Sequence, residues 1–138
     1  MENESSVKIS SEWDIVAARQ LGRKISKELG FGTVDQTRIT TAISELARNI
    51  YLYAGKGEIH FEPVTSFSKS GLKVIAVDHG PGIQDIRKAL EDGFSTSGGL
   101  GAGLPGVKRL MDEFDLISSL GEGTTIHVVK WLRDRRFG

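Results

Sequence analysis

The residues of this sequence that could do chemistry begin with a carboxylate and an amide four positions apart. Glu45 and Asn49 lie in a segment whose apolar side chains recur with helical spacing, so both project from one face of a helix, on the same flank as Arg38. A glutamate at the edge of a core can accept a proton, and an asparagine oxygen can bind a hard cation such as Mg²⁺. A hydrogen-bonding pair on the surface would have the same spacing.

Glycines form three groups, each at the end of an expected helix or strand. The first lies in Asp78 to Gly82, directly after the apolar stretch Leu72 to Val77. A carboxylate that ends a buried strand needs hydrogen-bond donors, because its desolvation is costly. The amino group of a purine is one suitable donor. A turn aspartate that caps its own backbone explains the same residues and, for this motif alone, explains them better.

The second group, Gly98 to Gly106, is the densest and leads into an expected helix, after the hydroxyl residues Ser95 to Ser97. Bare backbone lets N–H groups approach an anion closely, and a helix N-terminus adds its dipole, so this segment is a plausible phosphate cradle. A flexible loop with a glycine-rich helix start is the alternative. The G-x-G-x-x-G spacing within it resembles a dinucleotide fingerprint only weakly, because no strand directly precedes it.

The third group is Gly121-Glu122-Gly123-Thr124, between two stretches with strand character. As a bare tetrapeptide it is explained by a hairpin turn. None of the three groups continues into Gly-Lys-Ser/Thr at the spacing of a Walker A motif, so a P-loop is excluded.

Helices that could position these motifs are visible in the hydrophobic spacing. We expect helices over Glu12–Leu29, Val34–Tyr53, Ile83–Glu91 and Leu104–Phe114. The first is expected to bury residues spaced four apart, namely Trp13, Ala17, Leu21, Ile25 and Leu29. The second is expected to bury the stripe Ile39, Ile43, Leu46 and Ile50.

Strands are expected over Val7–Ile9, Glu58–Glu62, Leu72–Val77, Asp115–Leu120 and Thr124–Leu132, with a turn over Thr65–Gly71. Ile59 and Phe61 should point inward, and the nearly all-apolar third strand should be buried on both faces. Because helices alternate with strands but the last two strands form a hairpin, the pattern predicts a two-layer α/β sandwich with a mixed sheet. We expect a single domain over residues 1–138, with its core from about residue 7 to residue 132.

The overall composition narrows the function classes. Eighteen Lys and Arg balance eighteen Asp and Glu, so the chain lacks the basic field that non-specific nucleic-acid binding requires. With no cysteine, the chain has no disulfide, thiolate nucleophile or zinc–thiolate site. No signal peptide or membrane-spanning run is visible, and we expect a cytoplasmic protein without a membrane partner.

Taken together and in order, these motifs resemble the four boxes of the GHKL superfamily, the Bergerat-type ATP-binding proteins that include gyrase B, Hsp90, histidine kinases and MutL. The four boxes match Glu45–Asn49, Asp78–Gly82, Gly99–Leu104 and Gly121–Thr124. Within that superfamily, the chain from about Val7 to Trp131 is similar to the small anti-sigma-factor-type serine/threonine kinases. The resemblance implies an α+β fold whose mostly antiparallel sheet is covered by helices on one face.

The resemblance also implies a role for each matching residue. Glu45 would be the general base on the substrate hydroxyl, and Asn49 a ligand of Mg²⁺. Asp78 would accept a hydrogen bond from the adenine amino group, and the Thr124 hydroxyl would lie near the adenine. The remaining contacts with ATP would come from Gly80, Gly82, Ser97, Gly99, Gly101, Gly103 and Leu104.

The function implied by the resemblance is ATP-dependent phosphorylation of serine or threonine on STAS-domain proteins. The substrates would be the antagonist and the scaffold of the stressosome. Their phosphorylation would release this chain to bind and activate a PP2C-type phosphatase, which starts the general stress response of the sigma-B pathway. One alternative is an ATP-responsive binding module in which turnover is incidental. A histidine-kinase catalytic fragment is a third interpretation, weakened by the lack of a dimerisation helix in the sequence.

Overall fold

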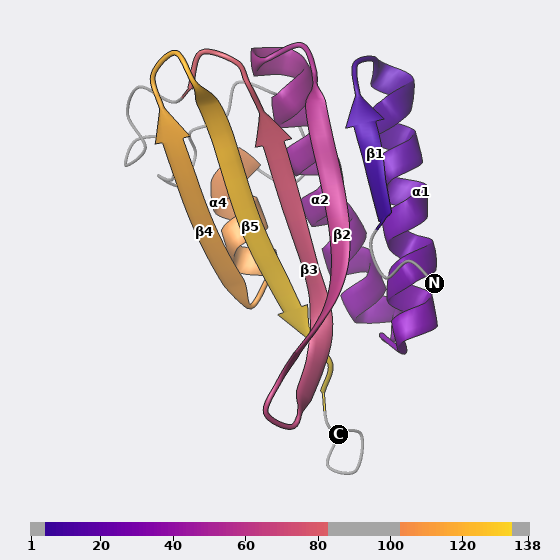
Figure 1. Ribbon diagram of the computed structural model, residues 1–138. Helices are drawn as coiled ribbons and strands as arrows, with labels where there is room; N and C mark the ends of the chain where they lie inside the picture. Colours follow the sequence, from indigo (N-terminus) through magenta and orange to yellow (C-terminus); the bar gives the residue numbers. More distant parts are fainter. Residues whose placement is uncertain (1–4, 83–102, 134–138) are drawn as a thin grey trace.

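The computed structural model describes residues 5–82 and 103–133 (Figure 1). The helices are α1 (Glu12–Leu29), α2 (Thr33–Tyr53) and α4 (Gly103–Leu110). The strands are β1 (Ser5–Ile9), β2 (Gly57–Ser66), β3 (Lys69–Asp78), β4 (Glu113–Ser119) and β5 (Gly123–Trp131). The helix expected over Ile83–Glu91 falls outside the described residues, as do Ser97, Gly99 and Gly101. None of the described helices is long and apolar enough to cross a membrane.

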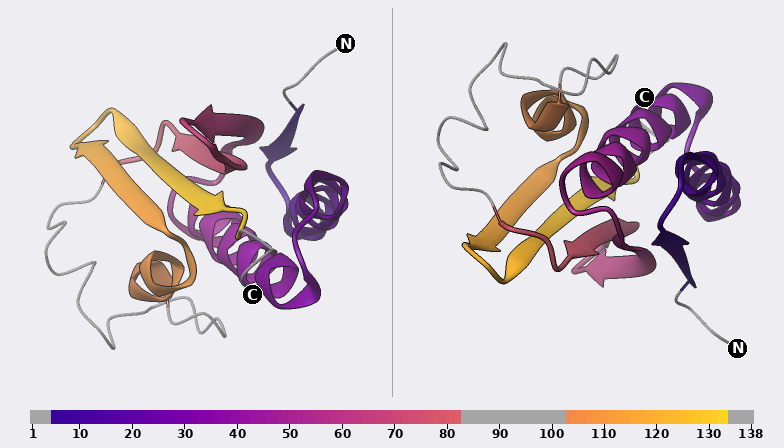
Figure 2. Two further views of the ribbon diagram at one scale, coloured as in Figure 1. Left: turned by 90° about the horizontal axis from the view of Figure 1, so that it is seen from below. Right: turned by 90° about the horizontal axis from the view of Figure 1, so that it is seen from above.

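The five strands form one sheet in the order β1-β2-β3-β5-β4, and α1, α2 and α4 all lie on one of its faces, with α2 in the middle (Figure 2). This arrangement confirms the expected two-layer α+β fold. All four strand pairings are antiparallel, so the described sheet is not mixed. The reason for the first pairing is that two helices, rather than one, join β1 to β2. They return the chain to the end of the sheet where β1 finished (Figure 1).

Helix α2 carries the predicted catalytic pair and packs most deeply. Its predicted stripe is confirmed, since Ile39, Ile43, Leu46 and Ile50 are all buried. Ile59 and Phe61 of β2 point inward as expected and join the same core. Helix α1 can approach closely because Gly22 has no side chain, and a Cβ there would collide with Ile43. The backbone of α2 is thus fixed from both sides.

Helix α1 was predicted only in part in its buried face, since the expected residues Leu21, Ile25 and Leu29 are partly buried and pack against the core. Its buried residues are Ile15, Ala18, Gly22 and Ser26, whereas Trp13 is 81% exposed and Ala17 is also exposed. A step of four residues turns about 400° around a helix, so a line of such steps drifts by about 40° each time. Five residues spaced four apart therefore cannot share one face over the whole helix.

Strand β3 is central but buried on one face only, contrary to expectation. Leu72, Val74 and Ala76 are buried beneath the helices, whereas Ile75 and Val77 on the other face are partly exposed. No described helix covers that second face. The apolar run in β3 therefore reflects its central place in the sheet, not a layer on each side.

Two of the predicted boundaries that differ from the structure have a common cause. The turn expected over Thr65–Gly71 is reduced to Phe67 and Ser68, because β2 and β3 pair as far as Ser66 and Lys69. The helix expected to reach Phe114 ends at Leu110, because Phe114 pairs with Val128 in the sheet. In both places, residues that the local sequence pattern predicts to be turn or helix are instead part of a strand, because they pair with a neighbouring strand.

The carboxyl group of Asp14, in the first turn of α1, should make the stability of the protein depend on pH. The backbone N–H groups of Ser10 and Ser11 donate to Asp14 Oδ2 at 2.8 and 3.0 Å. These bonds, led by the one from Ser10, hold the pKa of the Asp14 carboxyl below its ordinary value of 3.8. Because the folded-state pKa is lowered, the stabilisation is present above the unfolded-state pKa and is lost as pH falls through the folded-state pKa.

We expect Asp14→Ala to lower the melting temperature at neutral pH, and this difference from wild type to shrink as the pH falls below 3.8. Glu12→Ala removes an acid from the same first turn, but one without these backbone bonds, and serves as the control. Thermal unfolding followed by circular dichroism measures both variants. A difference for Asp14→Ala that stays constant with pH would contradict this account.

Candidate functional site

Four residues form a line across four strands at one end of the sheet. In the register of the strands, Gly57 lies opposite Asp78, Asp78 opposite Thr124, and Thr124 opposite Ser118. Residues paired in this way point to the same face, here the helix-covered one, since Asp78 follows Ala76 and Thr124 precedes Ile126 in the inward alternation. We call these four residues the end row. The carboxylate and hydroxyl predicted to face one base are therefore direct neighbours.

Asp78 makes the backbone cap that was the alternative explanation for this motif. Its Oδ1 accepts a hydrogen bond from the Gly80 N–H at 2.9 Å. Within residues 5–82 and 103–133, Oδ2 has no hydrogen bond. The carboxylate thus shapes the turn through one oxygen only, so the backbone cap and the predicted contact with a ligand are compatible.

The loops after β3 and β4 are in direct contact beside the end row. The N–H of Gly121 donates to the carbonyl of Pro81 at 2.9 Å. Gly82 has φ of 81°, and a Cβ there would collide with the Ser119 carbonyl oxygen. Gly123 has φ of 109°, and a Cβ there would collide with the carbonyl oxygen of Asp78. Both glycines are therefore required by the approach of protein backbone, before any nucleotide is considered.

A pair of glycines in one hairpin tests this requirement. Gly121 and Gly123 both have positive φ, but only Gly123 would bring a Cβ against backbone, because nothing lies within 4 Å of a Cβ at Gly121. We expect Gly123→Ala to weaken ATP binding at least ~10-fold, since moving β5 from β3 displaces Thr124 from Asp78. Gly121→Ala should lower stability by only about 1–2 kcal/mol, because an alanine there must adopt a left-handed backbone conformation, and it should leave ATP binding nearly unchanged. Calorimetric titration with ATP separates the two, and equal losses would show that the close contact is unimportant.

Glu45 is a buried carboxylate with one oxygen unpaired. It is 2% exposed, and its Oε1 has no hydrogen-bond partner in the described part of the chain. Its Oε2 lies 3.9 Å from Nε of Arg48, which is the cation beside it. Asn49, one turn further along α2, is partly exposed. A buried polar atom without a partner is costly, which points to a hydroxyl or water as its partner in the working protein.

Arg38, predicted to share the flank of Glu45 and Asn49, donates a hydrogen bond to Asp35 at 3.0 Å. Arg48 and Ser118 are the two residues at the site that sequence reasoning did not assign. Arg48 could have been found from its spacing, because a residue three positions from Glu45 is its neighbour on a helix. Ser118 could have been found only from the register of the last hairpin, which the sequence does not specify.

Two further predicted site residues begin α4. Gly103 is its first residue and has φ of 71°, a left-handed conformation that favours glycine. The side chain of Leu104 is buried in the hydrophobic core. Pro105 is tolerated in the first turn, as expected. Leu104 therefore anchors α4, and only its backbone remains for contact with a ligand.

The end of α2 meets the same end of the sheet. A Cβ at Gly80 would come within 2.6 Å of Ala54 Cβ, and one at Gly57 within 2.8 Å of Ile50 Cγ2. The residues here suit a purine nucleotide: Asp78 and Thr124 offer adjacent oxygens, and Glu45 keeps a buried oxygen unpaired. Among the described residues, no three His, Asp or Glu side chains form a metal site. Mg²⁺ would depend on Asn49 together with phosphate oxygens and water, an arrangement common for this ion.

Comparisons with protein families and with curated proteins agree on the kind of protein that this chain resembles. The family described as "Histidine kinase-, DNA gyrase B-, and HSP90-like ATPase" matches residues 34–135. The chain is 74% identical over 133 residues to serine/threonine-protein kinase RsbT of Bacillus subtilis, a match that covers 96% of this chain and 100% of that protein. It is 30% identical over 98 residues to an anti-sigma F factor of a Thermoanaerobacter species, covering 68% of each chain.

Two solved structures share the fold at low sequence identity. The crystal structure of the RsbU and RsbW domains of a Mycobacterium tuberculosis protein superposes with a TM-score of 0.61 at 16% identity. That match covers 94% of this chain, which spans 33% of the larger one. The mycobacterial sensor histidine kinase MprB superposes with a TM-score of 0.54 at 15% identity, covering 93% of this chain and 97% of that one.

Proposed function

Because this chain belongs to the histidine kinase-, DNA gyrase B- and HSP90-like ATPase family and is a serine/threonine-protein kinase within it, we propose that it phosphorylates STAS-domain proteins. ATP is the phosphoryl donor. The substrates we propose are the antagonist and the scaffold of a stressosome in the cytoplasm. The observation that carries the proposal is the buried Glu45 carboxylate, whose Oε1 has no partner among the described residues.

Glu45 orients and deprotonates the substrate hydroxyl in this scheme. Arg48 lies on the side of Oε2, so Oε1 is the oxygen available to accept a hydrogen bond from the attacking serine or threonine. Phosphoryl transfer depends mainly on positioning and on charge neutralisation, so one well-placed acceptor and a held nucleotide meet most of its needs.

The nucleotide is held at both of its ends. Asp78 and Thr124 receive the base at the end row. The bare backbone at Gly80 and Gly82, together with the segment that contains Ser97, Gly99, Gly101 and Gly103, would contact the rest of ATP. Asn49 would hold Mg²⁺, which neutralises phosphate charge.

We propose that phosphorylation also switches partners. A phosphorylated STAS protein would lose affinity for this chain, because two added negative charges change the surface that it presents. The released kinase would then bind and activate a PP2C-type phosphatase and start the sigma-B stress response. Similarity over the whole length of RsbT supports this extension.

A transfer assay with parallel detection of release tests the proposal. The purified chain is incubated with [γ-³²P]ATP, Mg²⁺ and a STAS antagonist, and size-exclusion chromatography follows the complex. We expect label on a serine or threonine of the antagonist and dissociation at the same rate. An antagonist whose acceptor residue is replaced by alanine serves as control. Label without dissociation would contradict the switch, and no label would contradict the choice of substrate.

A further inference from the structure

Ser118 is joined to Thr124 at the edge of the end row. Their hydroxyl oxygens lie 2.8 Å apart, and Ser118 Oγ also donates to the carbonyl oxygen of Gly123 at 3.2 Å. Ser118 lies on β4 and the other two residues on β5, so these bonds tie together the two strands at the point where the predicted base-contacting hydroxyl sits.

The chemistry of the three groups fixes the direction of the bonds. A carbonyl oxygen can only accept, so the single proton of Ser118 is directed to Gly123. In the contact between the two hydroxyls, Thr124 must then be the donor. The proton of Thr124 is therefore used inside the protein, and its oxygen is left with lone pairs. Thr124 is only 8% exposed, which limits competition from water.

Thr124 thus becomes an acceptor beside another acceptor. Its register partner is Asp78, whose Oδ2 has no hydrogen bond within the described residues. Two adjacent acceptors are complementary to an amino group, which has two hydrogens. They repel a carbonyl oxygen in the same place. Adenine carries an amino group at position 6, whereas guanine carries a carbonyl there.

We propose that Ser118 determines specificity for adenine over guanine, by holding the proton of Thr124 and so making the end row an acceptor surface. Ser118 acts through Thr124 and is a positioning residue. The inference rests on the proposed nucleotide site and adds to it the reason why one purine is selected.

Titration calorimetry with ATP and with GTP, each with Mg²⁺, tests the inference on the intact chain. In Ser118→Ala, the Thr124 hydroxyl is free to turn and donate. We therefore expect the ratio of the GTP to the ATP dissociation constant to fall about 10-fold, the scale of one hydrogen bond. Ser118→Thr keeps the hydroxyl and should keep the ratio. Ser119→Ala changes the neighbouring exposed serine and should leave the ratio at the wild-type value.

The outcomes separate this inference from the proposed function. Wild-type ATP binding with an unchanged ratio in Ser118→Ala overturns the inference and leaves the ATP site standing. Wild-type protein that binds neither nucleotide overturns both. A ratio that falls equally in Ser119→Ala also overturns the inference. If Ser118→Ala is unfolded at the assay temperature, Ser118→Cys replaces it, because a thiol of similar size is a weak donor and should also lower the ratio.

Discussion

Replacing Glu45 with glutamine is expected to slow phosphoryl transfer about 10²- to 10⁴-fold, the range that general-base catalysis contributes. Glutamine has nearly the shape of glutamate, but its amide cannot take a proton from the substrate hydroxyl. The side chain is buried, and its Oε1 has no partner in the described residues, so this oxygen is available to take the proton. ATP binding should persist, because Asp78 and Thr124 are unchanged.

Single-turnover transfer from [γ-³²P]ATP measures this effect, with calorimetry to show that nucleotide still binds. Glu28→Gln makes the same chemical change at an exposed position near the end of α1, and should transfer at the wild-type rate. Undiminished transfer by Glu45→Gln would remove Glu45 from its role. The same variant tests whether the proposed phosphatase activation needs turnover. If Glu45→Gln stimulates the phosphatase fully, the chain also works as an ATP-responsive activator.

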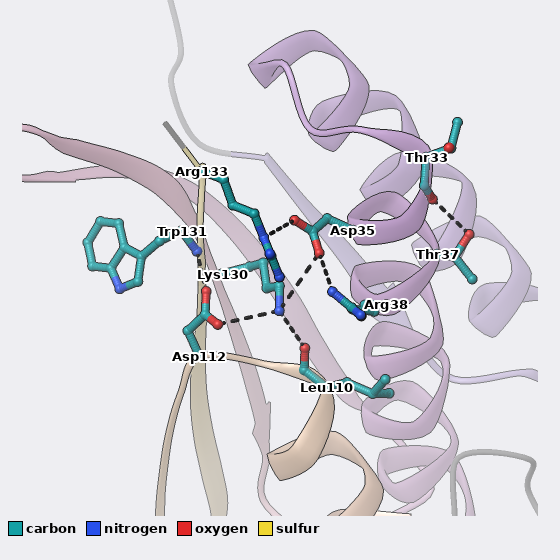
Figure 3. Close-up of polar contacts among 9 residues, drawn as sticks. All are labelled: Thr33, Asp35, Thr37, Arg38, Leu110, Asp112, Lys130, Trp131 and Arg133. Atoms are coloured by element: carbon teal, nitrogen blue, oxygen red, sulfur yellow. Dashed lines mark hydrogen bonds and ion pairs between the residues drawn. The ribbon is translucent and has the colours of Figure 1, made fainter. Parts of the chain in front are cut away.

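The second large effect is expected at Lys130, on β5. Its side chain is 7% exposed, and Nζ donates to the Leu110 carbonyl at 2.9 Å and to Asp112 Oδ1 at 3.4 Å (Figure 3). It also lies 3.9 Å from Oδ1 of Asp35, whose carboxylate pairs with Arg38 and Arg133. The amine therefore joins β5 to the first turn of α2 and to the end of α4.

We expect Lys130→Met to lower the free energy of unfolding by about 3–5 kcal/mol, because removal of one partner leaves buried charge and a helix-end carbonyl uncompensated. Denaturant unfolding measures the change. Lys73→Met, on the partly exposed face of β3, removes the same amine from the sheet and should cost far less. A loss in Lys130→Met as small as that in Lys73→Met would show that the cluster contributes little.

Helix α2 was well predicted from the sequence because its signals are local. Its apolar stripe has one period, and Glu45 and Asn49 follow from that period as neighbours on one flank. Arg38 shows the limit of this kind of prediction. A helical wheel gives the direction of a side chain around the axis but not which partner captures it, and Asp35 lies one turn away.

The end row was not predictable in the same way. Asp78 and Thr124 are neighbours because β5 lies between β3 and β4. The hydrophobic pattern of a strand does not specify which other strands it pairs with. The role of Lys130 was hidden for a similar reason: a lysine near the end of a strand gives no sign of a buried position. Contacts between residues distant in sequence depend on the assembled sheet, and the family resemblance supplied what periodicity could not.

Nuclear magnetic resonance of the ¹⁵N-labelled chain, titrated with ATP and Mg²⁺, tests the central claim most directly. The account predicts saturable shifts that are largest at the backbone amides of Asn49, Asp78, Gly80, Gly82 and Thr124. The amides of Lys73, Ile75 and Lys130, further along β3 and β5, should move little. Saturable binding with its largest shifts at those three residues, or no binding at all, would contradict the placement of the nucleotide site at this end of the sheet.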